Sequence, residues 1–192
     1  MDVTVPVEDG VSIERARKLG FTLMDTNLCF SAERGTIPAV ERIEVAFARP
    51  EMEAALGAIA ERAFVFDRFH RDPLTAQSAG IIKRDWARNF FSGGRGEWMV
   101  AASHSGVPVG FLQLLRSAIG ELVIDLIAVD SACFGQGLAT AMIGYAARHC
   151  DVPGPVVVGT QVANVRSIRL YERLGFRLRS AQYVFHHHGG QT

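Results

Sequence analysis

Apolar residues from position 43 onward follow two periods in turn, one typical of strands and one typical of helices. Alternating or wholly apolar runs bounded by glycine or proline indicate strands, whereas apolar residues three or four positions apart indicate helices. In chain order the pattern predicts a strand over residues 43–47, a helix from Pro50 to residue 63, a helix over 79–91, strands over 98–102, 109–115 and 121–129, a helix over 137–149, a strand over 156–162, a helix from Asn164 to Gly175, and strands over 176–180 and 182–187.

The turns between these elements indicate how the strands pair. The sequence Ser-Gly-Val-Pro at residues 105–108 reads as a hairpin, and Gly120 reverses the chain again, so the three middle strands are expected to be antiparallel. The helix over 137–149 then crosses over to residues 156–162, an apolar run consistent with a strand that is buried on both faces of a sheet. This arrangement predicts an α/β (α+β) fold with a mixed, mostly antiparallel central sheet flanked by helices.

A short internal repeat links the two ends of the chain. Residues 18–23, Lys-Leu-Gly-Phe-Thr-Leu, parallel residues 173–178, Arg-Leu-Gly-Phe-Arg-Leu, and nine residues after each phenylalanine stands another, Phe30 and Phe185. The match is either a coincidence in a short window or the trace of a duplication, in which a helix end followed by two strands occurs twice. In the second interpretation residues 1–35 are a remnant of a duplicated unit. A remnant strand then has to pair with the main sheet or with a second subunit.

Composition and charge limit the classes of function. The 192 residues, 48% of them hydrophobic, are enough for one sizeable core, and the length indicates one domain plus an appendage. Lys plus Arg equals Asp plus Glu at 20 each, so no net field favours nucleic acid or an anionic membrane as a partner. The first residues carry no secretory signal, and no run approaches the roughly 20 apolar residues that a bilayer requires. A cytoplasmic protein is expected.

Cysteines and histidines give no metal-site pattern. Cys29, Cys133 and Cys150 are odd in number and lack metal-ligand spacing, which fits reduced and mostly buried thiols. His104 falls in the hairpin turn and is expected to be exposed. The three histidines at residues 186–188 alternate between strand faces, so all three cannot bind one ion, and a solvated tail is the simpler interpretation. No metal is expected.

The strongest chemical signal is a glycine-rich turn that follows the strand over 121–129. Residues 134–139, Phe-Gly-Gln-Gly-Leu-Ala, lead directly into the helix over 137–149. A turn of this kind at a helix start presents backbone N–H groups that can converge on a phosphate. The sequence therefore predicts a phosphate site at this turn.

A second signal is an asparagine and a tyrosine on one face of the next helix. Positions 164, 168, 171 and 175 fall in one narrow stripe, and Asn164 and Tyr171 lie two turns apart, about 10 Å along the axis. This spacing suits a long, flexible ligand arm that lies along the helix.

The two signals together resemble the GNAT superfamily of acetyl-coenzyme A-dependent N-acetyltransferases. The family's phosphate turn has Arg or Gln first and small residues after it; Gly135, Gly137 and Ala139 match, and Phe134 replaces the Arg or Gln. The second family motif places Ala three, Tyr seven and Gly-Phe eleven residues after an Asn, and here only Ser167 departs, at the Ala position. The resemblance implies the GNAT fold over residues 42–188, acetyl-CoA as cosubstrate and no metal.

The resemblance also implies which residues bind the cosubstrate. In the family the strand before the phosphate turn separates from its neighbour, so that its main chain can bind pantetheine and polarise the acetyl carbonyl. Val129 N–H is the candidate donor to the developing oxyanion, although the same residues also form an ordinary core strand. The implied cosubstrate-binding residues are Leu126, Ile127, Val129, Phe134, Gly135, Gln136, Gly137, Leu138, Ala139, Asn164, Ser167 and Tyr171.

Tyr171 is the candidate general acid. A phenol with a pKa near 10 stays protonated at neutral pH and can donate its proton to the departing thiolate. The alternative is a half-buried core tyrosine whose hydroxyl is satisfied. Asn164 would bind a pantetheine amide; it is also well suited to be a helix N-cap, and both roles can hold.

The general base has one candidate, Asp125. It lies in the apolar run 123–127, where a carboxylate is costly to bury unless it is paired or hydrated, so a catalytic role and a salt bridge to a neighbouring arginine are both open. Many family members use only a chain of water molecules for this step.

The acceptor pocket is expected to involve residues 64–73, an aromatic and cationic segment after the first predicted helix. Arg68, His70 and Arg71 could bind a sugar, base or phosphate; the alternative is a packed interhelical turn with its charges in water. This segment, Gly159 to Gln161, and the N-terminal repeat resemble the dTDP-fucosamine N-acetyltransferases of surface-polysaccharide synthesis. That resemblance implies Arg68, His70, Arg71 and Gln161 as substrate-binding residues.

The resulting hypothesis is direct acetyl transfer from acetyl-CoA to the primary amine of a small molecule, most specifically a dTDP-linked amino deoxysugar. Two alternatives stay open: acetylation of a peptide N-terminus or an antibiotic amine, and a non-catalytic acyl-CoA-binding module. A homodimer is expected only if the remnant strand pairs with a second subunit.

Overall fold

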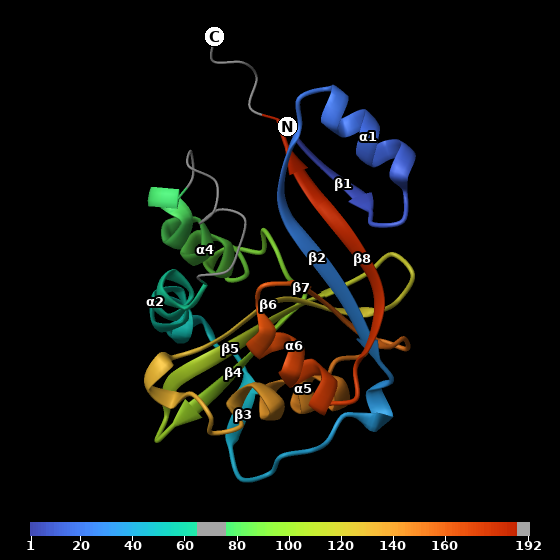
Figure 1. Cartoon of the computed structure of the whole chain (residues 1–192). Helices are drawn as coiled ribbons and strands as arrows, with labels where there is room; N and C mark the ends of the chain where they lie inside the picture. Colours follow the sequence, from blue (N-terminus) through green and yellow to red (C-terminus); the bar gives the residue numbers. More distant parts are fainter. Residues whose placement is uncertain (65–75, 188–192) are drawn as a thin grey trace.

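The computed structural model describes residues 1–64 and 76–187 of the chain. Its described strands form one sheet in the order β1-β8-β2-β7-β6-β5-β4-β3 (Figure 1). The strands are β1 (Asp2–Pro6), β2 (Thr22–Ala32), β3 (Glu44–Phe47), β4 (Trp98–His104), β5 (Val107–Arg116), β6 (Leu122–Val129), β7 (Val156–Gln161) and β8 (Arg177–His186). The helices are α1 (Gly10–Lys18), α2 (Glu53–Ala63), α4 (Ala79–Arg88), α5 (Leu138–His149) and α6 (Val165–Arg173).

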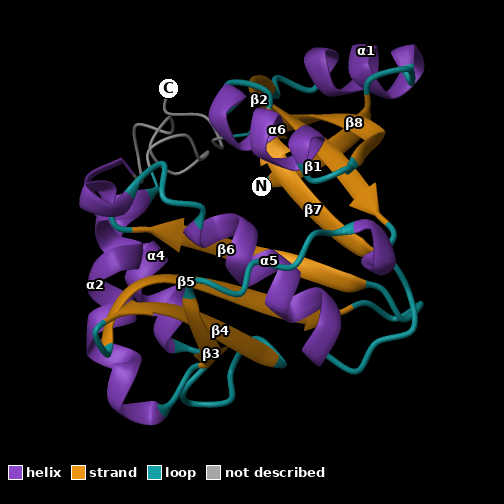
Figure 2. Cartoon of the chain, turned by 90° about the horizontal axis from the view of Figure 1, so that it is seen from below, coloured by secondary structure: helices purple, strands orange, loops and turns teal. Residues whose placement is uncertain are grey.

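Helices cover both faces of the sheet, which explains the nearly continuous apolar sequence of its middle strands (Figure 2). Successive side chains of a strand point to opposite faces. Along β4, Met99 and Ala101 pack with α2 and α4, whereas Val100 and Ala102 pack with α5. The sheet is therefore the middle layer of the protein and has a core on each side.

The predicted elements between residues 43 and 175 are confirmed, with ends displaced by a few residues. The three middle strands are antiparallel, as expected, and β7 joins β6 as the parallel pair of the sheet. Pro50 begins the short 3-10 helix η2 (Pro50–Met52), and α2 follows from Glu53. Helix α4 ends at Arg88 rather than at residue 91 because the chain continues as turns from Asn89 toward Gly93.

The two strands predicted at residues 176–180 and 182–187 are wrong: the structure has a single strand there, β8. The pairing with β2 skips Arg179, because Cys29 pairs with Ser180 and Phe30 with Leu178. An extra residue of this kind is a β-bulge, which interrupts the alternation of a strand without ending it.

The N-terminal segment repeats the C-terminal one element by element. Strand β1, helix α1 and strand β2 correspond to β7, α6 and β8 at a constant separation along the chain, so that Gly20 corresponds to Gly175 and both have positive φ values, +78° and +86°. The segment differs from the expected remnant in one respect. Its helix is followed by one bulged strand, β2, rather than by two strands, since β2 skips Met24 as β8 skips Arg179.

The pairing of β2 with β8 has an internal twofold symmetry. Asn27 pairs with Gln182 at its centre, and pairs on one side repeat on the other: Thr22 with His186 mirrors Ser31 with Arg177. Outside this pair, β1 joins β8 and β7 joins β2 in equivalent registers. The order β1-β8-β2-β7 is thus symmetric about the β8–β2 pair (Figure 1).

Strand β2 lies inside the sheet, so the pairing expected for the N-terminal segment is made within the chain. It joins β7 on one side and β8 on the other. Phe30 of β2 belongs to the main core together with Tyr171 and Phe176. The ends of this half of the sheet also meet: Met1 N–H donates to the His187 carbonyl over 3.1 Å, and His187 N–H donates to the Met1 carbonyl over 2.9 Å.

Candidate functional site

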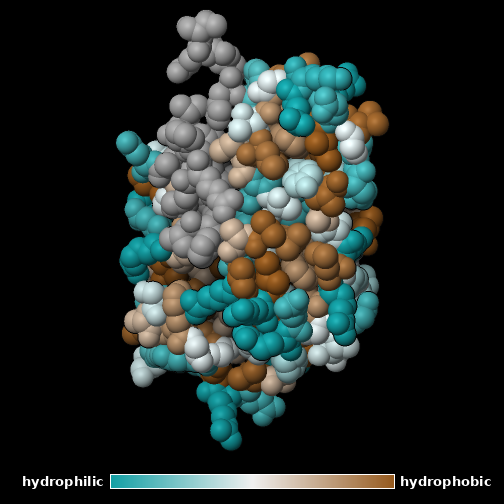
Figure 3. Space-filling model, in the orientation of Figure 1, coloured by the Kyte–Doolittle hydropathy of each residue, from teal (hydrophilic) through white to brown (hydrophobic). Residues whose placement is uncertain are grey.

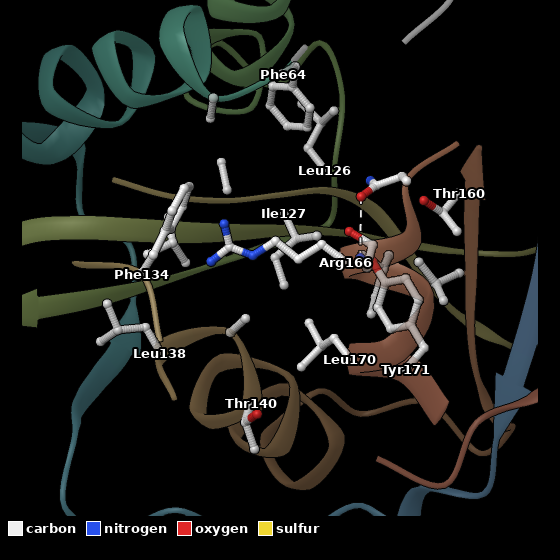
Figure 4. Close-up of a pocket in the computed structure, with 18 of the residues that line it drawn as sticks. Phe64, Leu126, Ile127, Phe134, Leu138, Thr140, Thr160, Arg166, Leu170 and Tyr171 are labelled. Atoms are coloured by element: carbon white, nitrogen blue, oxygen red, sulfur yellow. Dashed lines mark hydrogen bonds between the residues drawn. The ribbon is translucent and has the colours of Figure 1, made fainter. Parts of the chain in front are cut away.

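The candidate site is a cleft of about 470 Å³ that opens where β6 and β7 separate (Figure 4). These parallel strands pair at only three positions, the last joining Ile124 to Val158. Beyond it, residues 126–129 line one side of the cleft and residues 159–161 the other. The remaining walls come from the turn at 134–139 and from helix α6. A ligand can therefore insert between two strands whose facing main-chain groups are not used by each other.

The glycine-rich turn lies at the end of this cleft with its helix amides available. Asp130 caps the 3-10 turn η4 (Ser131–Cys133) by accepting from Ala132 N–H over 3.0 Å. Gly135 and Gly137 then both adopt φ of +80°, a conformation that favours glycine. Gly137 is the N-cap of α5 and has no side chain to accept from the first helical turn. The first amides of α5 are thus open to an anion.

The backbone of Val129 has the orientation that an oxyanion donor needs. Val129 pairs with Gly110 of β5, and the next residue, Asp130, donates its N–H to the Val109 carbonyl over 2.8 Å. In an antiparallel ladder this pattern makes Val129 a non-hydrogen-bonded position, so its N–H points away from β5. The opposite side is the cleft. The role of Val129 as oxyanion donor stays a prediction.

Asn164 is the N-cap of α6, which confirms the capping role predicted for it. Its side-chain oxygen accepts from Ser167 N–H over 3.2 Å, the bond drawn dashed in Figure 4. Both residues also line the cleft. The side-chain amide nitrogen of Asn164 is not part of this cap, so capping and ligand binding are compatible.

Tyr171 lines the cleft from α6 and is 2% exposed (Figure 4). Its ring packs against Phe30 and Phe176, with ring centroids 6.2 Å and 5.5 Å apart. Burial raises the pKa of its phenol well above the ordinary value of 10, because a phenolate is costly in a poorly solvated place. Tyr171 is therefore both a core residue and a protonated group at the cleft.

Asp125 forms a salt bridge with Arg95, which was one of the two roles that the sequence left open for it. Its Oδ1 accepts from Arg95 Nη2 over 2.6 Å, and its Oδ2 accepts from Arg95 Nε over 2.7 Å and from Trp86 Nε1 and Gln113 Nε2 over 3.1 Å each. The β5–β6 pairing skips Asp125, so it occupies a bulge beside the cleft that it lines. Its role as general base stays a prediction.

Three cationic residues that line the cleft, Lys83, Arg166 and Arg173, were missed by the sequence analysis. Lys83 lines the cleft and lies over the rings of Trp86 and Phe64, 4.5 Å and 5.1 Å from their centroids. The available signal was its position on α4, four residues from the buried Ala79 and Ala87 on the face that packs on the sheet. Arg166 is the second; its guanidinium carbon lies 3.6 Å from the centroid of the Phe134 ring.

The other predicted site residues divide into two groups. The cleft lining includes all the predicted cosubstrate-binding residues and one predicted substrate-binding residue: Leu126, Ile127, Val129, Phe134, Gly135, Gln136, Gly137, Leu138, Ala139, Asn164, Ser167, Tyr171 and Gln161. The remaining predicted substrate-binding residues, Arg68, His70 and Arg71, lie outside the described residues. Phe64, just before them, lines the cleft.

The histidines and cysteines considered in the sequence analysis do not form a second site among the described residues. His104 is exposed at the hairpin, as expected. The predicted solvated tail is wrong for His186, which is buried as the last residue of β8, while His188 lies outside the described residues. The three cysteines are free thiols, and burial raises the pKa of Cys150 to about 11. In residues 1–64 and 76–187, no three His, Cys, Asp or Glu side chains are grouped as metal ligands. No helix in these two stretches combines the length and the apolar character that crossing a bilayer requires.

The cleft between separating strands, the glycine turn at a helix start and the tyrosine of α6 define a class of protein. The chain belongs to the acetyltransferase (GNAT) family, whose model matches residues 58–176.

Among individual relatives, the chain is similar to "Spore coat polysaccharide biosynthesis protein SpsD" of Bacillus subtilis (strain 168). The two are 34% identical over 135 residues, which are 69% of this chain and 46% of SpsD. The chain thus spans about half the length of this curated relative.

Solved structures with low identity share the fold. A conserved protein of unknown function from Staphylococcus epidermidis ATCC 12228 superposes with a TM-score of 0.72 at 16% identity, over 96% of this chain and 70% of that one. A GCN5-related N-acetyltransferase from Kribbella flavida gives 0.67 at 19% identity, over 98% and 68%. A tandem GNAT protein from the clavulanic acid biosynthesis pathway gives 0.67 at 16% identity, over 100% and 64%.

Proposed function

We propose that this protein transfers an acetyl group from acetyl-CoA to the primary amine of a nucleotide-linked amino deoxysugar. Family membership supports acyl-CoA-dependent acetyltransferase chemistry in general. The observation that carries the acetyl-CoA-dependent part of the proposal is the cleft between β6 and β7, with the phosphate turn at one end and Tyr171 of α6 in its wall. A long thioester that enters this cleft could place its phosphates at the glycine turn and its thioester beside Tyr171.

In the proposed reaction, acetyl-CoA and the amine bind together. The amides of residues 135–139 bind the diphosphate, and Val129 N–H polarises the thioester carbonyl. The amine nitrogen attacks the carbonyl carbon, forming a C–N bond and a tetrahedral intermediate. When the C–S bond breaks, the Tyr171 phenol gives its proton to the thiolate, and solvent returns a proton to the phenolate.

The attacking amine must also lose a proton. We propose that Asp125, or water ordered next to it, receives that proton. The carboxylate lines the cleft and is held by Arg95, Trp86 and Gln113, so its position is fixed while its lone pairs are largely occupied. A relay through water suits this arrangement, because the carboxylate is held in place by these partners and a water molecule can bridge it to the amine.

The sugar acceptor is supported by two likenesses. The sequence resembles the dTDP-fucosamine N-acetyltransferases, and SpsD is named for polysaccharide biosynthesis. Gln161 at the β7 side of the cleft would donate to or accept from a sugar hydroxyl. Arg68, His70 and Arg71 would bind the remainder of the nucleotide sugar.

A substrate panel tests this proposal. The full chain is incubated with acetyl-CoA and dTDP-linked amino deoxysugars, peptides with free N-termini, or aminoglycosides, and release of free CoA thiol is measured. We expect kcat/KM for the amino sugars to exceed that for the other amines by at least about 100-fold. Preference for a peptide or an antibiotic would replace the sugar assignment, and tight CoA binding without turnover on any amine would favour the non-catalytic alternative.

We also propose that residues 1–35 are the remnant of a duplicated acetyltransferase unit and that residues 42–188 form the GNAT acetyltransferase domain. The support is the equivalence of β1–α1–β2 with β7–α6–β8, including both bulges. The tandem GNAT protein noted above superposes on all of the chain. A homodimer is not needed to complete the pairing of β2, since β7 and β8 already flank it.

A further inference from the structure

Arg166 is a cation placed across the cleft, next to the phosphate turn. It lies in the first turn of α6, and its side chain reaches over the cleft to the Phe134 ring (Figure 4). The guanidinium carbon is 3.6 Å from the ring centroid, well within cation–π range. Phe134 is the residue directly before Gly135 and the open amides of α5. The guanidinium is therefore held beside the place that an anion bound at this turn would occupy.

In the described part of the chain, the Arg166 guanidinium contacts an aromatic ring but has no anionic partner. Among residues 1–64 and 76–187, no carboxylate forms an ion pair with Arg166, and the first turn of α6 contains no acidic residue. A helix N-terminus carries a partial positive charge, which makes this an unfavourable place for a second cation. An anionic ligand would reverse this penalty.

Phe134 occupies the position at which the family motif has an Arg or Gln. Its ring is 46% exposed, although it is large and apolar. The hydropathy view shows apolar residues gathered near the middle of the face in view (Figure 3). An aromatic ring cannot bind phosphate, but its face can hold a guanidinium in place. The cation missing from position 134 can thus be supplied from α6.

We propose that Arg166 binds the diphosphate of CoA and that Phe134 is the platform that orients it. This inference rests on the proposed function and assigns the charge that neutralises the cosubstrate. A guanidinium binds two phosphate oxygens in a planar, bidentate manner. Together with the main-chain donors of the turn, Arg166 surrounds the diphosphate from the α6 side, so that the thioester is directed along the cleft toward Tyr171.

The test measures CoA affinity by calorimetry for wild type, Arg166→Ala and the charge-matched control Arg169→Ala. Arg169 is an exposed arginine on the same helix that does not line the cleft. We expect Arg166→Ala to raise the Kd for CoA about 10- to 100-fold, the usual effect of losing a charge-assisted contact, and Arg169→Ala to change it less than about 2-fold. Equal affinity of wild type and Arg166→Ala would overturn the proposal.

Two ligand arms identify which phosphate is bound. Dephospho-CoA lacks the 3′-phosphate and keeps the diphosphate, so Arg166→Ala is expected to weaken it by the same factor as CoA. S-acetylpantetheine lacks both, so the substitution is expected to leave its affinity unchanged. A loss confined to CoA would transfer Arg166 to the 3′-phosphate and refute the diphosphate assignment. A higher KM for the amine acceptor at saturating acetyl-CoA, with unchanged CoA affinity, would instead assign Arg166 to the acceptor.

A rescue variant separates a binding role from a structural one. In the Arg166→Ala background, Phe134→Arg restores a cation at the turn and is expected to recover at least 10-fold of the lost CoA affinity. Phe134→Leu alone is expected to weaken CoA about 3- to 10-fold by removing the platform. Absence of rescue, with melting temperatures equal to wild type, would contradict the proposal. If wild type itself binds no CoA, the proposed function fails and this inference fails with it, whereas equal CoA binding by wild type and Arg166→Ala overturns this inference alone.

Discussion

Tyr171 is held in a fixed position and keeps its proton at neutral pH. Phe30 and Phe176 fix its ring, and burial raises its pKa. The raised pKa means that the neutral phenol is favoured in the folded protein. The favourable contribution of the protonated form to stability is complete below the unfolded pKa of about 10 and decreases as pH rises above it. Throughout the neutral range the proton is available.

The first prediction at this scale is that Tyr171→Phe lowers kcat about 100-fold or more while CoA affinity changes little, because only the proton donor is removed. Since Tyr171 does not ionise between about pH 6 and about pH 9.5, the ratio of wild-type to variant kcat should be constant over that range. Steady-state kinetics at several pH values measure it. Tyr145→Phe, on α5 and outside the cleft lining, is the control. Full kcat in Tyr171→Phe would show that another group protonates the thiolate.

Some residues of the cleft could be predicted from the sequence, and others could not. Spacing placed Asn164 and Tyr171 on one helix face, and both line the cleft. The sequence left Asp125 open between a salt bridge and a catalytic role, because its partners Trp86 and Arg95 come from a separate part of the chain. Nothing in the local sequence of Asp125 identifies those partners. The Arg166–Phe134 contact is missed for the same reason.

At the scale of elements, the turn between β6 and α5 determines where an anion can bind. Gly135 has φ of +80°, and a Cβ added there would meet no described atom within 4 Å. Gly93, after α4, has φ of +73° and equally open surroundings. The two glycines are thus matched in backbone strain and differ in proximity to the cleft.

We predict that Gly135→Ala and Gly93→Ala each destabilise the protein by about 1–2 kcal/mol, the cost of a left-handed conformation for a residue with a Cβ. Only Gly135→Ala should also weaken CoA binding, by about 10-fold or more, because the added methyl group enters the space of the bound phosphates. Thermal unfolding and calorimetry provide the two measurements. Parallel loss of CoA affinity in both variants would mean that strain alone is responsible.

Hydrophobic periods predicted the order of the elements because each period reports which side of an element is buried. They failed at β8, where the bulge at Arg179 shifts the alternation by one residue and makes one strand resemble two. They also could not place β2 between β7 and β8. That position depends on long-range pairing, which the local pattern of residues 22–32 does not encode.

For the molecule as a whole, the N-terminal segment is part of the architecture that holds the site. Phe30 of β2 is 3% exposed and packs against Tyr171 in the main core. Its symmetric counterpart, Phe185 of β8, is also 3% exposed, but it lies in a smaller cluster with Val5 and Ala16. The internal symmetry thus supplies a matched pair of core phenylalanines, one near the cleft and one remote from it.

We predict that Phe30→Ala and Phe185→Ala each lower the free energy of unfolding by about 3–5 kcal/mol, as expected for buried phenylalanines. Phe30→Ala should in addition lower kcat, because the Tyr171 ring loses a packing neighbour. Phe185→Ala should retain wild-type kcat at a temperature where it is folded. Chemical denaturation and kinetics on the same samples test this difference. An equal fall in kcat for both variants would indicate general loosening rather than a specific link to Tyr171.

The meeting of Met1 with His187 has a mechanical consequence. Asp2 pairs with His186, so Met1 and His187 lie together at one end of the β1–β8 ladder. Tension applied through Met1 and His187 loads the cross-strand hydrogen bonds one at a time, like a zipper, because these bonds run perpendicular to antiparallel strands. The outermost strand, β1, should therefore peel away at low force, while its neighbour β8 stays paired with β2 on the other side.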